Sequence, residues 1–85
     1  MKILWTEEAW NDYLYWHQQN QYSVIKKINR LIKDIKQEPF EGIGKPEPLK
    51  YNLSSKWSRK ITSEHRMIYK YVDDTLFIYS VKEHY

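Results

Sequence analysis

The hydrophobic pattern of this 85-residue chain changes its period across residues 39–48, a segment that holds all three prolines and both glycines. Before that segment, apolar side chains between Val24 and Ile35 recur every three or four residues, which is typical of an amphipathic helix. After it, three runs rich in Ile, Val, Tyr and Phe are joined by short polar turns, which is typical of β-hairpins. The change predicts helices first and a strand meander second.

Local signals mark the ends of the predicted helices. Thr6 is a good N-cap residue, and Glu7 and Glu8 suit the positive end of a helix dipole. Pro39 disfavours helical geometry in the residue before it, so the second helix should end by Glu38. The expected order is a strand at residues 2–5, two helices, a loop, and strands at 57–62, 65–72 and 75–81.

These elements predict an α+β fold in which a two-helix hairpin packs on a small antiparallel β-sheet. A chain of 85 residues can build one hydrophobic core and is too short for a second. Residues 1–85 are therefore expected to form a single domain.

The pairing register of the first predicted hairpin decides which cations share a face of the sheet. A two-residue turn at residues 63–64 would pair Ile61 with Arg66. Because side chains alternate along a strand, this register would place Arg59 on the same face as Arg66.

For the last hairpin we expect a three-residue turn at residues 73–75, which pairs Val72 with Leu76. This register places Arg66 and His84 on one face, whereas a two-residue turn would separate them. It also groups four apolar side chains on one face, namely Ile68, Val72, Leu76 and Ile78.

The chain has no cysteine, which excludes disulfides and thiolate metal sites and fits a reducing compartment. Glu7 and Glu8 interrupt the first apolar residues before a signal-peptide hydrophobic region could form, and no apolar run approaches membrane-spanning length. We therefore expect an unexported cytoplasmic protein with no membrane partner.

The net charge is modest, +3, but the basic residues are clustered in the second helix and in the first hairpin. Cations interleaved with aromatic rings suit single-stranded RNA, whose bases stack on rings while phosphates meet positive charge. An ordinary solvated face is the alternative for the helix, and core packing is the alternative for most of the rings.

Neither a metal nor a cofactor is expected. The sequence has no His-Glu-x-x-His pattern, no EF-hand carboxylate cluster and no Cys-His spacing. The segment Gly42 to Lys45 lacks the spacing of a nucleotide-binding phosphate loop.

Three residues could cleave RNA without a metal, because RNA carries its own nucleophile in the 2′-hydroxyl. The reaction needs a base for the 2′ proton, a cation for the charge on the phosphate and an acid for the leaving 5′ oxygen. The candidates are Glu47, held between two prolines, Arg66, in an otherwise apolar strand, and His84, after the last strand. Two alternatives without a catalytic role stay open. Glu47 could be an incidental charge in a surface loop, and Arg66 could form a cross-strand ion pair with a residue such as Glu64 or Asp12.

Several motifs resemble the YoeB (Txe) toxins of the RelE superfamily, and the resemblance covers essentially the whole chain. The motifs are YLYW at 13–16, PFEG at 39–42, GKPEPLK at 44–50, NLS at 52–54, WSR at 57–59, EHR at 64–66 and HY at 84–85. The resemblance implies the RelE-like microbial ribonuclease-type fold and a ribosome-dependent endonuclease that cuts messenger RNA in the A site of the 70S ribosome and stops translation. It also implies a YefM-type antitoxin as partner.

By the same resemblance, Glu47 is the general base, Arg66 stabilises the phosphate and His84 is the general acid. Tyr85 would shape the active site and orient the substrate, and Lys50 and Arg59 would contact substrate or ribosomal RNA. Lys60, a further candidate for substrate contact, stands where many relatives have a second arginine, and Lys cannot form a bidentate fork with phosphate. Relatives are often homodimers, although no residue pattern here decides that state.

A second function stays open at this point. A basic, aromatic sheet could block a ribosomal or RNA site without cutting anything, using the same cations and rings but no titrating base or acid.

Overall fold

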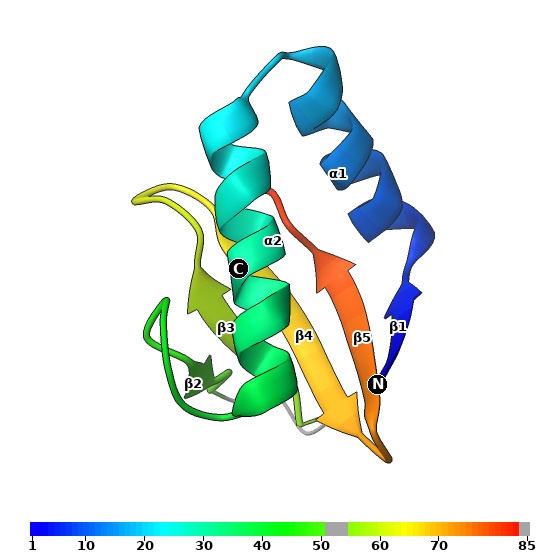
Figure 1. Ribbon diagram of the computed structural model, residues 1–85, viewed down its shortest axis with the longest axis vertical. Helices are drawn as coiled ribbons and strands as arrows, with labels where there is room; N and C mark the ends of the chain where they lie inside the picture. The colour runs from blue at the N-terminus through cyan, green and yellow to red at the C-terminus, as the bar shows by residue number, and fades with distance from the viewer. Residues whose placement is uncertain (51–54, 84–85) are drawn as a thin grey trace.

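The computed structural model describes residues 1–50 and 55–83, and in this part of the chain two helices lie on one face of a five-stranded sheet (Figure 1). The predicted α+β fold is confirmed. The elements are β1 (Lys2–Trp5), α1 (Glu7–Gln18), α2 (Tyr22–Gln37), β2 (Glu47–Pro48), β3 (Trp57–Lys60), β4 (Arg66–Val72) and β5 (Thr75–Ser80).

The helix ends follow the local signals. The Thr6 side chain accepts a hydrogen bond from the backbone N–H of Ala9 at 3.0 Å, so α1 has its predicted N-cap. Asn20 takes a positive φ of 54° after α1, which turns the chain into α2. Glu38 is extended before Pro39 and ends α2 where expected.

The core lies between the helices and the sheet. Trp16 contributes its ring and also donates from Nε1 to the Val81 carbonyl at 3.0 Å, which satisfies a buried polar group. The apolar stripe of α2 is buried as predicted, apart from Ile32, which is partly buried. The buried core residues are Ala9, Trp16, Val24, Ile25, Ile28, Leu31, Ile35, Ile61, Met67, Tyr69, Leu76, Ile78 and Val81.

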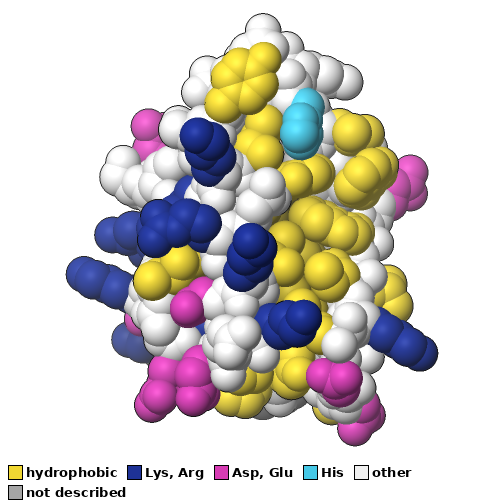
Figure 2. Space-filling model, viewed as in Figure 1, with side chains coloured by type: hydrophobic (Ala, Val, Ile, Leu, Met, Phe, Trp, Pro, Cys, Tyr) yellow, Lys and Arg dark blue, Asp and Glu magenta, His cyan; other side chains and the backbone are white. Residues whose placement is uncertain are grey.

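The opposite side of α2 carries the basic residues Lys26, Arg30, Lys33 and Lys36, all of them exposed. Figure 2 shows Lys and Arg side chains along and beside α2, next to a broad hydrophobic surface. Neither helix described in the structure is long and apolar enough to cross a membrane.

The sheet has the strand order β1-β5-β4-β3-β2 and is mixed rather than wholly antiparallel. β1 runs parallel to β5, with Lys2 opposite Thr75 and Trp5 opposite Ile78. The other three pairings are antiparallel. Glu47 and Pro48, expected in a loop, form the edge strand β2, where a proline is tolerated because one side of an edge strand needs no hydrogen-bond donor.

The predicted register of the first hairpin is wrong by one residue, because Lys60 and not Ile61 lies opposite Arg66. The turn between β3 and β4 is longer than the two residues expected. The Thr62 hydroxyl accepts hydrogen bonds from the backbone N–H groups of Glu64 and His65 at 3.1 and 3.0 Å, which closes a local turn. Lys60 therefore shares a face with Arg66, and Arg59 lies on the other face.

The predicted three-residue turn of the last hairpin is also wrong. Asp73 and Asp74 form a two-residue turn with φ values of 52° and 55°, so Val72 lies opposite Thr75. A β-bulge then adds Tyr79 to β5, and beyond it Ile68 lies opposite Ser80. Beyond the bulge, β4 and β5 therefore pair in the register that the predicted three-residue turn would have given.

The apolar face expected from that turn is therefore wrong as well. Leu76 and Ile78 are in the core beneath the helices. Ile68 alternates with the core residues Met67 and Tyr69, so it faces away from the helices, and Val72 is exposed.

Gly44 lies where the loop after α2 meets β3. Its φ is 80°, and a Cβ there would lie 2.9 Å from Leu31 Cδ2 and 3.0 Å from the Lys60 carbonyl oxygen. Its own carbonyl accepts a hydrogen bond from the Lys60 N–H at 2.6 Å. The neighbouring Lys45 also has a positive φ, 50°, without being glycine.

Gly44→Ala should lower the free energy of unfolding by about 2 kcal/mol, because the new methyl group meets backbone in a strained conformation. Lys45→Gly is the matched control, and should leave that free energy unchanged or raise it, because glycine adopts positive φ without strain. Urea unfolding of the two variants measures both effects. Equal stability of Gly44→Ala and the parent would contradict this packing.

Candidate active site on the open face of the sheet

The side of the sheet opposite the helices carries no helix among the described residues, and we call it the open face (Figure 1). Because side chains alternate along strands, the pairing registers determine which of them reach this face. From β2 to β4 they are Glu47, Ser58, Lys60, Arg66, Ile68 and Lys70.

Glu47 and Arg66 meet on the open face. Arg66 Nη1 lies 3.8 Å from Glu47 Oε1, and the two side chains are 28% and 64% exposed. β2 brings Glu47 opposite Ser58, and β3 in turn places Lys60 opposite Arg66. Two of the three predicted catalytic residues therefore come together, although 18 residues of sequence separate them.

The ion-pair partner of Arg66 is thus Glu47 and neither Glu64 nor Asp12. Asp12 is engaged elsewhere, since its carboxylate accepts a hydrogen bond from the Val81 N–H at 3.1 Å. Burial raises the pKa of Asp12, and the Val81 hydrogen bond opposes this effect.

Of the two predicted lysines, one lies beside this pair on the open face and the other lies in the turn after β2. Lys60 is partly exposed and lies opposite Arg66. Lys50 is exposed in the turn that follows β2. Cations on the open face near a carboxylate and a guanidinium suit a phosphate backbone.

His84 and Tyr85 lie outside the described residues. The chain before them is held at the start of β4, because the Arg66 N–H donates to the Glu83 carbonyl at 2.9 Å. The Glu83 N–H in turn donates to Nδ1 of His65 at 2.7 Å, which gives His65 a structural role. The backbone of Glu83 is therefore bonded to the residue that supplies the guanidinium.

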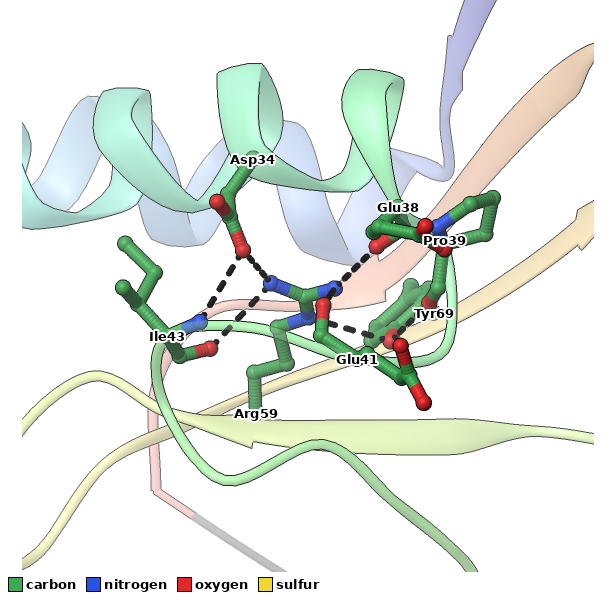
Figure 3. A network of polar contacts seen from close by, with 7 residues as sticks. All are labelled: Asp34, Glu38, Pro39, Glu41, Ile43, Arg59 and Tyr69. Atoms are coloured by element: carbon green, nitrogen blue, oxygen red, sulfur yellow. Dashed lines mark hydrogen bonds and ion pairs between the residues drawn. The ribbon is translucent and has the colours of Figure 1, made fainter.

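Arg59 does not join the other candidates, because its side chain has no exposed surface and points to the helix side (Figure 3). A guanidinium has five N–H donors, and here each nitrogen donates to a partner. Nε donates to the Tyr69 hydroxyl at 3.2 Å, Nη1 to Asp34 Oδ2 at 2.6 Å and the Ile43 carbonyl at 3.1 Å, and Nη2 to the Glu38 and Glu41 carbonyls at 2.7 Å each.

Asp34 and Tyr69 complete this network. The Asp34 carboxylate also accepts from the Ile43 N–H at 3.0 Å, and the Tyr69 hydroxyl donates to the Pro39 carbonyl at 2.7 Å. The hydrogen bond from Arg59 lowers the pKa of Asp34, and burial raises the pKa of Tyr69. No role was predicted for Asp34, which lies 25 residues from Arg59 in the sequence.

In the part of the chain that the structure describes, no group of three or more His, Asp or Glu side chains is placed to hold a metal ion. The pair formed by Glu47 and Arg66 offers instead a proton acceptor beside a fixed positive charge. Such a pair can act on a phosphate ester by proton transfer and charge stabilisation.

Solved structures of small bacterial toxins share the fold of this chain. The structure of the YoeB dimer from Staphylococcus aureus matches all of this chain and 98% of its own, with a TM-score of 0.92 and 45% identity. The YoeB-YefM heterotetramer from the same organism matches with a TM-score of 0.89 over the same shares of the chains. Toxin YoeB of Escherichia coli K12 is 58% identical over 85 residues, the full length of both chains.

The model of the YoeB-like toxins of bacterial type II toxin-antitoxin systems matches residues 5–85. The chain belongs to this family.

Arg59→Met should lower the free energy of unfolding by about 3 kcal/mol, because it leaves the Asp34 carboxylate and several carbonyls without their donor. Lys60→Met, one residue away on the open face, is the matched control, and should change that free energy by less than about 0.5 kcal/mol. Denaturant unfolding measures both. Similar losses in the two variants would contradict the assignment of Arg59 to the interior.

The Arg59–Asp34 ion pair should make stability depend on pH in the acid range. Since the native pKa of Asp34 lies below its usual value of 3.8, the stabilisation is complete above that value and is lost as the pH falls through the native pKa. Asp34→Asn removes this titration, so its deficit in unfolding free energy should shrink below about pH 4. Asp73→Asn, in an exposed turn, is the control, and a constant Asp34→Asn deficit would contradict the pairing.

Proposed function

We propose that this protein is a ribosome-dependent endoribonuclease that cleaves messenger RNA in the A site and thereby stops translation in the cytoplasm. The observation that supports this proposal is the contact of Glu47 with Arg66 on an exposed, lysine-rich sheet face. Membership of the YoeB-like toxin family supports it independently.

In the proposed reaction, Glu47 accepts the proton of a 2′-hydroxyl, and the 2′ oxygen attacks the adjacent phosphorus. The bond from phosphorus to the 5′ oxygen breaks, and His84 protonates that oxygen as it leaves. Arg66 stabilises the negative charge that develops on the phosphate. The products are a 2′,3′-cyclic phosphate and a 5′-hydroxyl, and no metal ion takes part.

The length of the Glu47–Arg66 contact suits these two roles. At 3.8 Å it is longer than a charge-assisted hydrogen bond, which measures about 2.8 Å. Arg66 is therefore oriented by Glu47 while its donors stay available to a phosphate. A partly exposed ion pair of this kind also contributes little to stability, so its replacement should leave the fold intact.

The proposed substrate contacts are Lys60 on the open face and Lys50 in the turn after β2, with Tyr85 orienting the RNA. The ribosome would supply the message in a geometry close to the reactive one. Arg59 has no part in these contacts, because it is buried.

We also propose that a YefM-type antitoxin holds the toxin inactive. The Staphylococcus aureus relative is described in a YoeB-YefM complex, which supports this partner. Positive charge on the open face would assist association with an acidic, initially disordered segment. A second relative structure is described as a dimer, so a homodimer is proposed as well.

Glu47→Gln, Arg66→Ala and His84→Ala should each lower cleavage of A-site message on purified 70S ribosomes by about 100-fold or more, while the melting temperature changes little. Primer extension measures the cleavage, because each cut leaves a defined new 5′ end. Glu41→Gln, an exposed carboxylate earlier in the same loop, is the matched control and should cleave like the parent.

Full activity in all three variants would refute the proposed roles. Translation arrest by the parent without any new RNA ends would instead favour the non-catalytic blocking module. Addition of the partner antitoxin should stop cleavage by the parent.

A further inference from the structure

The β-bulge in β5 places an aromatic ring on the open face. Tyr79 is the additional residue between Ile78, which faces the core, and Ser80, which lies opposite Ile68. Its backbone carbonyl is fixed by a hydrogen bond from the Thr6 hydroxyl at 3.0 Å. The ring itself is partly exposed, so the bulge presents it to solvent.

A cation lies against this ring. Lys56 Nζ is 4.2 Å from the centroid of the Tyr79 ring, at cation–π distance. Lys56 directly precedes β3 and Tyr79 lies in β5, so the contact crosses the open face over β4. Ile68 of β4 is only 2% exposed although it faces away from the helices, which is consistent with cover from these two side chains.

The ring also lies near the Glu47–Arg66 pair. Arg66 precedes Ile68 by two residues on β4, and Ile68 lies opposite Ser80, the neighbour of Tyr79. With about 3.3 Å per residue and about 4.8 Å between strands, the backbone positions of Arg66 and Tyr79 are roughly 10 Å apart. A nucleotide next to the one that meets Arg66 can span this distance.

We infer that Tyr79 and Lys56 form a nucleobase-stacking subsite for single-stranded RNA on the open face, beside the Glu47–Arg66 pair. This inference depends on the proposed function for the class of ligand and extends it to residues that no motif indicated. The base stacks on the Tyr79 ring, and the Lys56 ammonium leaves the ring to meet a neighbouring phosphate. Both interactions are sequence-tolerant, since every base has a π-face and every nucleotide a phosphate.

Binding of a six-nucleotide single-stranded RNA with 2′-O-methyl groups tests the subsite, because this RNA lacks the nucleophile and cannot be cleaved. Tyr79→Ala should weaken its binding, measured by fluorescence anisotropy, by about tenfold. Tyr79→Phe keeps the ring and should stay within about twofold of the parent. Tyr22→Ala removes a ring that is 64% exposed at the start of α2, and should have no effect.

Two further variants separate stacking from packing. Tyr79→Leu still covers Ile68 but has no aromatic ring, so it should bind RNA as weakly as Tyr79→Ala while melting at a temperature close to that of the parent. Lys56→Ala should weaken binding a few-fold and reduce the slope of log affinity against log salt by about 0.7. On programmed 70S ribosomes, Tyr79→Ala should raise KM and leave kcat nearly unchanged.

The inference is overturned if Tyr79→Ala or Tyr79→Leu binds the RNA as tightly as Tyr22→Ala does, or if the parent does not bind it. Failure of the proposed function is a different result: a parent that never cleaves message, with Tyr79→Ala still weakening RNA binding, would leave the subsite in place and remove the nuclease.

Discussion

The buried guanidinium of Arg59 is the constraint on which the arrangement of the molecule depends. A buried guanidinium is tolerated only when its N–H donors have hydrogen-bond acceptors, since removing the charge from water costs several kcal/mol. The partners come from the end of α2, the loop at residues 38–43 and β4. Three carbonyls of that loop turn inward toward one side chain (Figure 3). The loop conformation is therefore dictated by an interior charge, and the same loop continues into β2 and Glu47.

Neighbouring basic residues of β3 consequently serve the two faces of the sheet in different ways. Arg59 faces the helices, where several acceptors at fixed positions require the planar fork of an arginine. Lys60 faces outward beside Arg66, where a flexible point charge is sufficient for a phosphate. The basic side of α2 is a separate surface across the molecule, so positive charge is present on both layers.

Much of the fold could be predicted from the sequence, because its signals are local. The Thr6 cap, the stop before Pro39 and the stripe of α2 define the helices, and period-two runs define β3 to β5. The convergence of Glu47 and Arg66 was also predictable, through the resemblance to a known family. His84 and Tyr85 lie outside the described residues, so their roles stay predictions.

The pairing registers could not be predicted in the same way. The Thr62 hydroxyl widens one turn, and a bulge at Tyr79 offsets the other hairpin after its turn. Both features depend on geometry that alternation of polar and apolar residues does not encode. A shift of one residue exchanges the faces of a strand, and for this reason Arg59 was expected where Lys60 lies. The parallel pairing of β1 and the distant partner Asp34 carry no local signal either.

The position of β5 between β1 and β4 has a consequence for the order of events during synthesis. The first strand, the cap of α1 and the Trp16 indole all bond to residues 75–81, more than sixty positions later in the chain. Contacts so distant in sequence close late in folding. A nascent chain therefore holds its helices without the strand they pack on, and the sheet is completed only after residues 75–80 have been made. The topology thus delays closure of the sheet between β1 and β4 until the last described strand has been translated.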